Sequence, residues 1–205
     1  MGYTGRTNEL YTRMHNPRRL CHSAMMTGPD MPADMPHPVV LAYEEQIRPE
    51  LRQRLGPRIA RGNPVAATVF PNLSILRPTS RTLRVWHPRG PDKTECWAFV
   101  YADKAAPPEV KEAIRLAGAR VFGPGGTFEQ DDMDNWQGCT QTGRGVVARR
   151  HALNYTMGLG HERFEPDFGA IASDYRYSES NHRGFYRRWA QLMAASSWAE
   201  VTRPT

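Results

Sequence analysis

The sequence has few cysteines, no long apolar segment and no block of like charge. Its three cysteines, Cys21, Cys96 and Cys139, are widely separated, which excludes a disulfide framework and a zinc knuckle. The longest strongly apolar run, Cys96 to Ala102, is far shorter than the roughly 18–20 residues of a membrane span. The first residues contain no apolar core of a signal peptide. We therefore expect a cytoplasmic protein that does not enter a membrane.

Positive charge is in modest excess. The 205 residues include 27 Lys and Arg against 21 Asp and Glu, which gives a net charge of +6. The two signs are interleaved, and the densest basic stretch is Arg183 to Arg188. No motif that reads nucleic acid accompanies this charge, so a solvated surface explains it better than a nucleic-acid interface. We expect no nucleic acid among the partners, and strongly salt-dependent DNA binding would be the evidence for the opposite.

The hydrophobic pattern predicts a mixed α+β chain. Apolar residues at spacings of three and four predict a helix over 39–60, which Pro49 should kink or divide. Short β-prone runs follow at 65–70, 74–76, 82–87 and 94–102. A turn at 88–92 predicts that the last two form an antiparallel hairpin. Since residues 94–102 are apolar on both faces, we expect a central strand covered on both sides.

The rest of the chain alternates between helical and irregular patterns. Helices are predicted over 107–121 and 127–141, a possible strand over 154–159, and a last helix capped by Ser180-Asn181. One face of that helix carries apolar residues: Phe185, Trp189, Leu192 and Met193. Residues 1–38 lack periodicity and are rich in Met and Pro, which predicts an irregular loop over a core or, alternatively, an entrance lid over an apolar pocket.

An acidic segment between aromatic residues is the candidate for chemistry. Four acids fall between Glu129 and Asp134, and Phe128, Asp132 and Trp136 share one face of the predicted helix. A carboxylate on a buried face must be paired or bound to a metal. The acids could equally form an exposed first turn that complements the helix dipole. None of the seven histidines has a compact ligand spacing, and a His15–Cys21–His22 trio fits no known metal motif.

Several stretches taken together resemble one enzyme family. They are Thr68–Ser74, Arg84–Pro91, Glu95–Phe99, Phe122–Asp132, Met157–Gly160 and Arg183–Trp189. In this order and spacing, residues 64–205 resemble the C-terminal part of the catalytic domain in the α (large) subunit of Rieske-type aromatic-ring-hydroxylating dioxygenases, with the polycyclic-hydrocarbon branch nearest. The resemblance implies a partial helix-grip domain, an antiparallel sheet packed by helices that include a C-terminal helix. It places the catalytic, mononuclear-iron portion in residues 39–205 and implies that a Rieske domain is absent.

The resemblance also implies roles for individual residues. Asp132, the second Asp of Glu-Gln-Asp-Asp, matches the carboxylate ligand of the mononuclear iron. Phe128 and Phe122, four and ten residues before it, match positions that line the substrate pocket. Trp86 and Leu76 match two further pocket positions.

The activity implied for the parent enzyme is addition of both atoms of O2 to an aromatic hydrocarbon, which gives a cis-dihydrodiol. Electrons would arrive from a reductase and a ferredoxin through a [2Fe-2S] Rieske cluster to non-haem Fe(II), in an assembly with other α subunits and a small β subunit. The cluster's Cys-x-His and Cys-x2-His pairs do not occur in this sequence. We therefore expect a fragment that carries one iron ligand of three and is inactive in isolation. The alternative is a non-catalytic helix-grip module that binds an apolar ligand.

Overall fold

The computed structural model describes residues 11–15, 23–27, 37–56, 63–77, 81–166, 169–173 and 178–201. The chain divides into two compact units. Unit 1 comprises residues 1–32, 47–74 and 155–205, and unit 2 comprises residues 33–46 and 75–154. Helix α1 (Pro38–Leu55) and strand β4 (Leu73–Leu76) each run from one unit into the other. The mixture of helices with antiparallel strands confirms the predicted α+β class.

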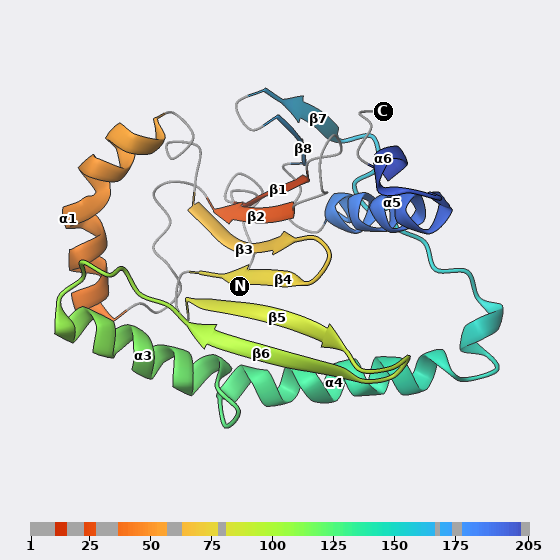
Figure 1. Cartoon of the computed structure of the whole chain (residues 1–205), viewed down its shortest axis with the longest axis horizontal. Coiled ribbons are helices and arrows are strands. Elements are labelled where there is room, and N and C mark those ends of the chain that lie inside the picture. Colours follow the sequence, from red (N-terminus) through yellow and green to blue (C-terminus); the bar gives the residue numbers. More distant parts are fainter. Residues whose placement is uncertain are drawn as a thin grey trace, which may run out of the picture. The chain divides into compact units, whose positions relative to one another are not determined.

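Unit 1 contains an antiparallel sheet and a helix that packs on it (Figure 1). The strand order is β3-β2-β1-β8-β7, and the bounds are β1 Tyr11–His15, β2 Ser23–Thr27, β3 Asn63–Val69, β7 Glu162–Glu165 and β8 Ala170–Ser173. Helix α5 (Ser180–Ala194) contacts β1 and β2, and a short helix α6 (Trp198–Val201) follows it. The rings of Phe70 and Phe185 pack edge to face at 5.2 Å, which joins the end of β3 to α5.

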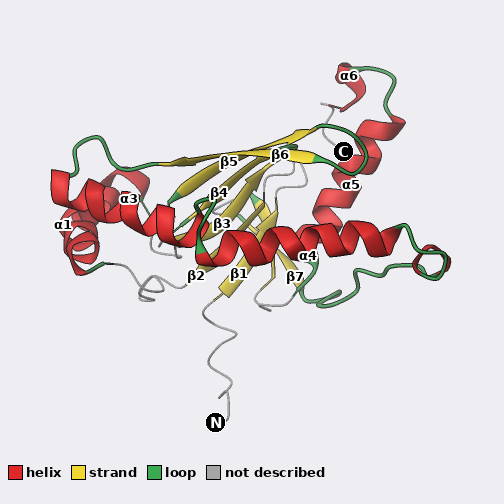
Figure 2. Ribbon diagram, turned by 90° about the horizontal axis from the view of Figure 1, so that it is seen from below, coloured by secondary structure: helices red, strands yellow, loops and turns green. Residues whose placement is uncertain are grey.

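Unit 2 is built on a β-hairpin and two consecutive helices. Strands β5 (Thr82–Pro88) and β6 (Thr94–Val100) are antiparallel, with Thr82 opposite Val100 and Trp86 opposite Cys96. Helix α3 (Pro108–Phe122) contacts β6 and is followed by helix α4 (Thr127–Gly143) and a 3-10 turn, η2 (Ala148–Arg150) (Figure 2). Apolar side chains of α3 form its core, since Val110 and Ile114 are each 2% exposed.

Several local expectations hold, and others are wrong. The hairpin and the helices over 107–121 and 127–141 are confirmed to within two residues. Helix α1 ends at Leu55, earlier than expected, and continues through Pro49 without division. The strand expected at 154–159 is irregular, and the strands lie later, at β7 and β8. Their residues show no clean alternation of apolar and polar side chains, so the sequence carries no strand pattern there.

The N-terminal segment 1–38 is also more ordered than expected, because β1 and β2 lie within it. The Pro- and Met-rich run over 28–36 lies outside the described residues, and so do Cys21 and His22 of the proposed metal trio. The covering loop and the entrance lid therefore both stay alternative predictions for this run.

Two predicted buried surfaces are exposed. Trp97 and Phe99 of β6 are 50% and 52% exposed, because they pair with Val85 and Leu83 and so lie on the face of the hairpin opposite the Arg84–Trp86 face that meets α4. Helix α5 buries Ser180, Gly184 and Arg188, whereas Phe185, Trp189 and Met193 are exposed. Its apolar spacing thus predicted a helix and only part of the side that packs, since Leu192 is half-buried and Phe185 contacts Phe70. The helix begins at Ser180 and its N-cap is Glu179, without a side-chain cap hydrogen bond, so the cap precedes the expected Ser180-Asn181 pair.

None of the helices in the described part of the chain combines the length and apolar character that a bilayer crossing requires.

Candidate functional site

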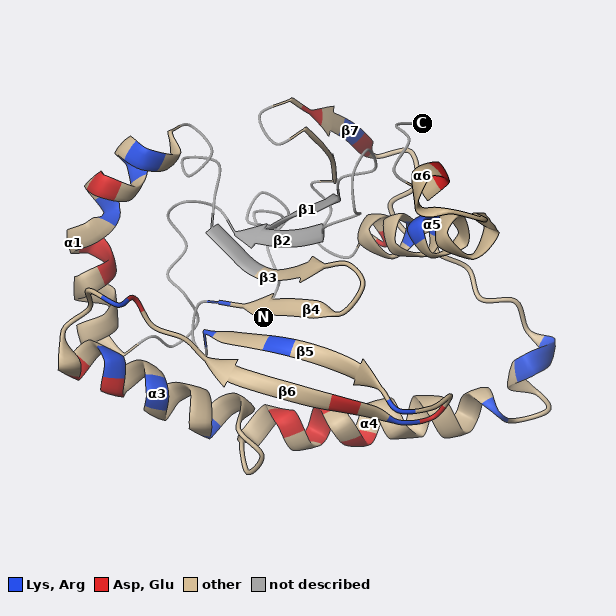
Figure 3. Cartoon of the chain, viewed as in Figure 1, with Lys and Arg blue, Asp and Glu red and all other residues tan. Residues whose placement is uncertain are grey.

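The acidic segment forms the first half of α4 (Figure 3). Every residue of α4 is described, and Glu129 is the only one that is buried, at 3% exposure. Asp132 is half-buried, and Trp136 is partly exposed but contacts β5. Glu129, Asp132 and Trp136 are spaced by three and four residues, so they share one face of the helix. The predicted buried carboxylate exists, but it is Glu129 rather than Asp132.

A buried ion pair joins α4 to the hairpin. Arg84 of β5 is 4% exposed, and its Nη2 donates to Oε2 of Glu129 at 2.5 Å. The guanidinium also lies over the ring of Phe122, 4.4 Å from its centroid, in cation–π geometry. Arg84 and Trp86 are two residues apart and therefore point to the same face of β5, the face that meets α4. One strand face thus supplies a cation and an aromatic ring to the candidate site.

The aromatic residues assigned to the pocket form two pairs. Trp86 packs edge to face on Trp136, with ring centroids 5.4 Å apart and planes at 79°. Phe122 and Phe128 are 5.9 Å apart, at the end of α3 and the start of α4. The structure therefore gathers Trp86, Phe122 and Phe128 around the face of α4 that carries Asp132. Leu76, the remaining predicted pocket residue, lies half-buried at the end of β4, outside these two ring pairs.

The turn between α3 and α4 explains the Phe-Gly-Pro-Gly-Gly sequence. A Cβ on Gly123 would lie 2.6 Å from the carbonyl oxygen of Ala119, and one on Gly126 would lie 2.7 Å from that of Val121. A side chain at either position would clash with the backbone at the end of α3, so the turn requires glycine there. The turn is closed by the Gly126 amide, which donates to the Gly123 carbonyl at 2.7 Å. It brings Phe128 back onto Phe122.

The electrostatics distinguish the two carboxylates on this face. Burial raises the pKa of Glu129 above its ordinary 4.5, the Arg84 guanidinium opposes that shift, and the charge of Asp132 adds to it. Asp132 is therefore close enough to Glu129 for their charges to interact. Burial also raises the pKa of the Cys96 thiol, which faces the same ion pair across the hairpin. Within the described residues, the carboxylate of this pair that is bound by a cation is Glu129, which pairs with Arg84.

The donors of a metal site are incomplete within the described residues. A carboxylate such as Asp132 is a suitable hard ligand for Fe(II), which in non-haem oxygenases is also bound by two histidines. Among the residues that the structure describes, no group of three His, Cys, Asp or Glu side chains lies close enough to hold a metal ion. These residues alone do not make a complete iron site, and Asp132 could supply only part of its ligand set.

Sequence patterns did not reveal the roles of Arg84 and Glu129. The Arg-x-Trp spacing places Arg84 beside Trp86 on one strand face, and Glu129 precedes Asp132 by one helical turn. Both spacings are visible in the sequence and indicate which residues share a face. The pairing of Arg84 with Glu129 is not visible in the sequence, because 45 residues separate the two positions.

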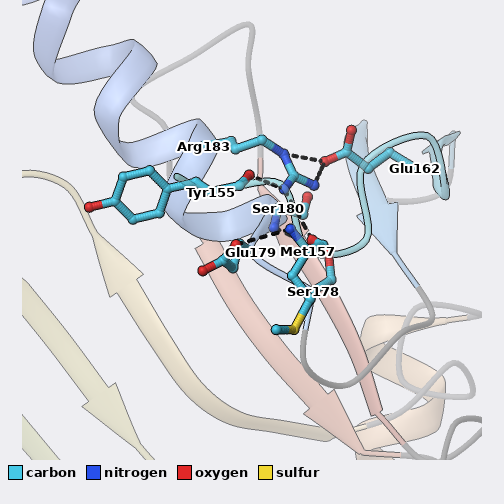
Figure 4. Close-up of polar contacts among 7 residues, drawn as sticks. All are labelled: Tyr155, Met157, Glu162, Ser178, Glu179, Ser180 and Arg183. Carbon is cyan, nitrogen blue, oxygen red and sulfur yellow. Dashed lines mark hydrogen bonds and ion pairs between the residues drawn. The ribbon is translucent and has the colours of Figure 1, made fainter. Parts of the chain in front are cut away.

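A second set of polar contacts explains two other motifs of the sequence (Figure 4). In unit 1, Arg183 of α5 binds Glu162 and donates from Nη1 to the carbonyls of Tyr155 and Met157 at 2.6 and 3.1 Å. Glu179 accepts from the Met157 amide at 3.0 Å. Gly158 has φ +73°, and a Cβ there would lie 2.8 Å from the Ser178 hydroxyl. The Met157–Gly160 loop is thus held by the start of α5, which indicates a structural role.

Comparison with known proteins identifies the family. Residues 7–195 match the family described as "ring hydroxylating alpha subunit (catalytic domain)". Biphenyl 2,3-dioxygenase subunit alpha of Rhodococcus jostii RHA1 is 45% identical over 140 residues, 67% of this chain and 30% of the relative. Benzene 1,2-dioxygenase subunit alpha of Pseudomonas putida is 38% identical over 176 residues, 83% of this chain and 39% of the relative.

The large oxygenase component of the naphthalene 1,2-dioxygenase system of Pseudomonas fluorescens is 30% identical over 167 residues. Identity to this naphthalene relative is lower than to the biphenyl relative, over a longer aligned stretch.

Solved structures agree in fold. A naphthalene 1,2-dioxygenase variant bound to phenanthrene superposes with a TM-score of 0.79 at 25% identity, covering 95% of this chain and 44% of that one. The Rhodococcus sp. enzyme bound to indole gives 0.73 at 32% identity, covering 96% and 48%. The chain thus spans less than half the length of these relatives. The match over 7–195 nevertheless covers most of the sequence, and the chain belongs to the family of ring-hydroxylating α-subunit catalytic domains.

Proposed function

We propose that this chain forms part of the mononuclear-iron domain of an aromatic-ring-hydroxylating dioxygenase. The whole enzyme would add both atoms of O2 to an aromatic hydrocarbon and give a cis-dihydrodiol. The observation that carries the proposal is the placement of Asp132 on the face of α4 that meets β5, between buried Glu129 and the Trp86–Trp136 contact. Family membership supports this proposal over a non-catalytic module that binds an apolar ligand.

The residues in this part of the chain suit two tasks. Trp86, Phe122 and Phe128 offer apolar aromatic walls of the kind that hold a planar hydrocarbon. Phe128 is 49% exposed, so a ring placed against it would gain apolar burial. Asp132 offers a carboxylate oxygen to iron, while the Glu129 carboxylate is paired with Arg84. Leu76 is proposed as a further wall. Iron, when bound, would supply the activation of O2.

The remaining assignments are proposals about the whole protein. Residues 39–205 would belong to the iron-binding domain and provide Asp132 as one ligand of three. A Rieske [2Fe-2S] cluster would deliver electrons that come from a ferredoxin and a reductase. Other α subunits and a small β subunit would complete the assembly, and the isolated 205 residues would show no oxygenase activity. The cytoplasmic location stays a prediction from composition.

A chimeric enzyme tests the proposal. The homologous segment of the Paraburkholderia xenovorans LB400 biphenyl dioxygenase α subunit, 44% identical over 135 residues, is replaced by this sequence. With the relative's own electron-transfer proteins, we expect the chimera to convert biphenyl to a cis-dihydrodiol. Asp132→Ala should abolish the product, whereas Asp131→Ala, an exposed acid on the same helix, should keep it. Equal product from both variants would contradict the role of Asp132.

A further inference from the structure

Charged and aromatic side chains, rather than a buried apolar face, join helix α4 to the hairpin. It buries only Glu129, while its large apolar residues Phe128, Met133 and Trp136 stay at least partly exposed. Apolar burial therefore contributes little to its placement. The hydrogen-bonded ion pair from Glu129 to Arg84 and the ring contact from Trp136 to Trp86 reach β5, and an ion pair from Arg144, the C-cap of α4, to Asp92 at 2.5 Å reaches the exposed turn of the hairpin.

Asp132 lies between the two contacts that reach β5. It follows Glu129 by three residues and precedes Trp136 by four, so it is one helical turn from each on the same face. A rotation or slide of α4 against β5 would move Asp132 together with both contacts. The ion pair and the ring contact therefore fix the position from which Asp132 can act.

The ion pair is suited to fixing the orientation of α4 rather than to increasing the stability of the fold. Both partners are buried, and the Nε of Arg84 has no hydrogen-bond partner. Burying two charges and an unpaired donor costs desolvation free energy, which apolar side chains of the same size would avoid. A charged hydrogen bond at 2.5 Å, however, depends on angle as well as on distance, whereas contacts between apolar groups are much less directional. Arg84 also contacts Phe122, so the same group fixes the end of α3.

We propose that Arg84 and Glu129 are positioning residues that set how α4 presents Asp132 and Trp136 to β5. The ion pair acts through Asp132 and the aromatic walls and does not itself contact the substrate. This inference rests on the proposed function, since it assigns the pair a purpose in the oxygenase site.

A spectroscopic test uses the 205-residue chain. The close, near-perpendicular indoles of Trp86 and Trp136 should give an exciton couplet in far-UV circular dichroism, which Trp136→Phe would identify by removing it. We expect Arg84→Met to lose the couplet and Arg84→Lys, which keeps the charge, to retain it. The double variant Arg84→Met/Glu129→Leu removes both charges and should fold, yet it should also lose the couplet. A matched control, Arg89→Met, breaks an exposed ion pair on the same hairpin and should keep it.

A wild-type couplet in either variant that carries Arg84→Met would overturn the inference, because α4 would then keep its position without the ion pair. If Arg84→Met alone does not fold, the double variant decides.

Product ratios in the chimera separate this inference from the proposed function. We expect the double variant to change the ratio of biphenyl dihydrodiol regioisomers and the Arg89→Met control to leave it unchanged. An active chimera whose ratio is the same in the double variant would contradict the positioning role alone. A parent chimera that forms no dihydrodiol would contradict the proposed function, and the couplet would still decide whether Arg84 and Glu129 position α4.

Discussion

Replacing Arg84 by Met should produce a loss of stability that depends on pH. The substitution keeps the apolar stem and leaves the Glu129 carboxylate buried without its cation. The least costly response is for Glu129 to take up a proton. At pH 7 this costs at most about 1.36 × (7 − 4.5), or roughly 3.4 kcal/mol, from its ordinary pKa of 4.5. That value lies within the range of about 3–5 kcal/mol found when one partner of a buried pair is removed.

The direction in which the stability of the Arg84→Met variant changes with pH follows from proton binding to Glu129. Burial raises the pKa of Glu129 in the folded state, and loss of Arg84 removes the charge that opposes this shift. Between pH 4.5 and the folded pKa, the folded variant binds more protons than the unfolded chain. Its free energy of unfolding therefore falls as pH rises through this window. The part of the destabilisation that comes from protonation should be near zero at pH 4.5 and increase by at most about 1.4 kcal/mol per pH unit, in addition to a loss of the Phe122 contact that does not depend on pH.

Urea unfolding followed by tryptophan fluorescence at pH 5, 6 and 7 measures the effect. Arg89→Met, which breaks the exposed pair with Glu95, is the control and should show no comparable dependence on pH. The double variant Arg84→Met/Glu129→Leu should regain most of the stability at pH 7, since it leaves no buried charge. A loss of the same size at all three pH values for Arg84→Met would refute the reasoning.

Three further predictions concern packing and the thiols. Gly158→Ala should lower stability by at least about 1 kcal/mol, because φ is +73° and the new Cβ would meet Ser178; a lower thermal midpoint would show it, and an unchanged midpoint would contradict it. Ile114→Ala, at a position 2% exposed in α3, should cost about 2–5 kcal/mol in urea unfolding, and a loss below about 1 kcal/mol would argue against a packed core there. Cys139 is exposed and should react with iodoacetamide before Cys96, whose pKa is raised by burial; peptide mass spectrometry would detect the order, and faster labelling of Cys96 would reverse the assignment.

Local patterns predicted the elements of unit 2 well. The Pro-Pro-Glu start and the Gly-rich stop define α3, and the turn at 88–92 defines the hairpin, because these signals act over a few neighbouring residues. Helical spacing placed Phe128 and Asp132 on one face, and the family resemblance added Trp86 and Phe122 and assigned the roles. The structure adds that Trp86, Phe122 and Phe128 come together around α4.

The features that the sequence did not predict depend on distant contacts. The Arg84–Glu129 pair joins a strand to a helix, and no local pattern specifies it. The packed side of α5 is set by Gly184 and Arg188, because a small residue allows close approach and the Arg188 guanidinium donates to the Val201 carbonyl at 3.0 Å. Hydrophobic spacing alone selected a neighbouring strip of that helix, where Trp189 and Met193 are exposed although Phe185 packs on Phe70.

The iron content of the chimeric α subunit tests the central claim most directly. The proposal assigns one ligand of the mononuclear iron to Asp132. We predict that Asp132→Ala loses the mononuclear iron while the visible absorption of the Rieske cluster is unchanged, and that Asp131→Ala keeps both. Full mononuclear iron occupancy in Asp132→Ala would contradict the account.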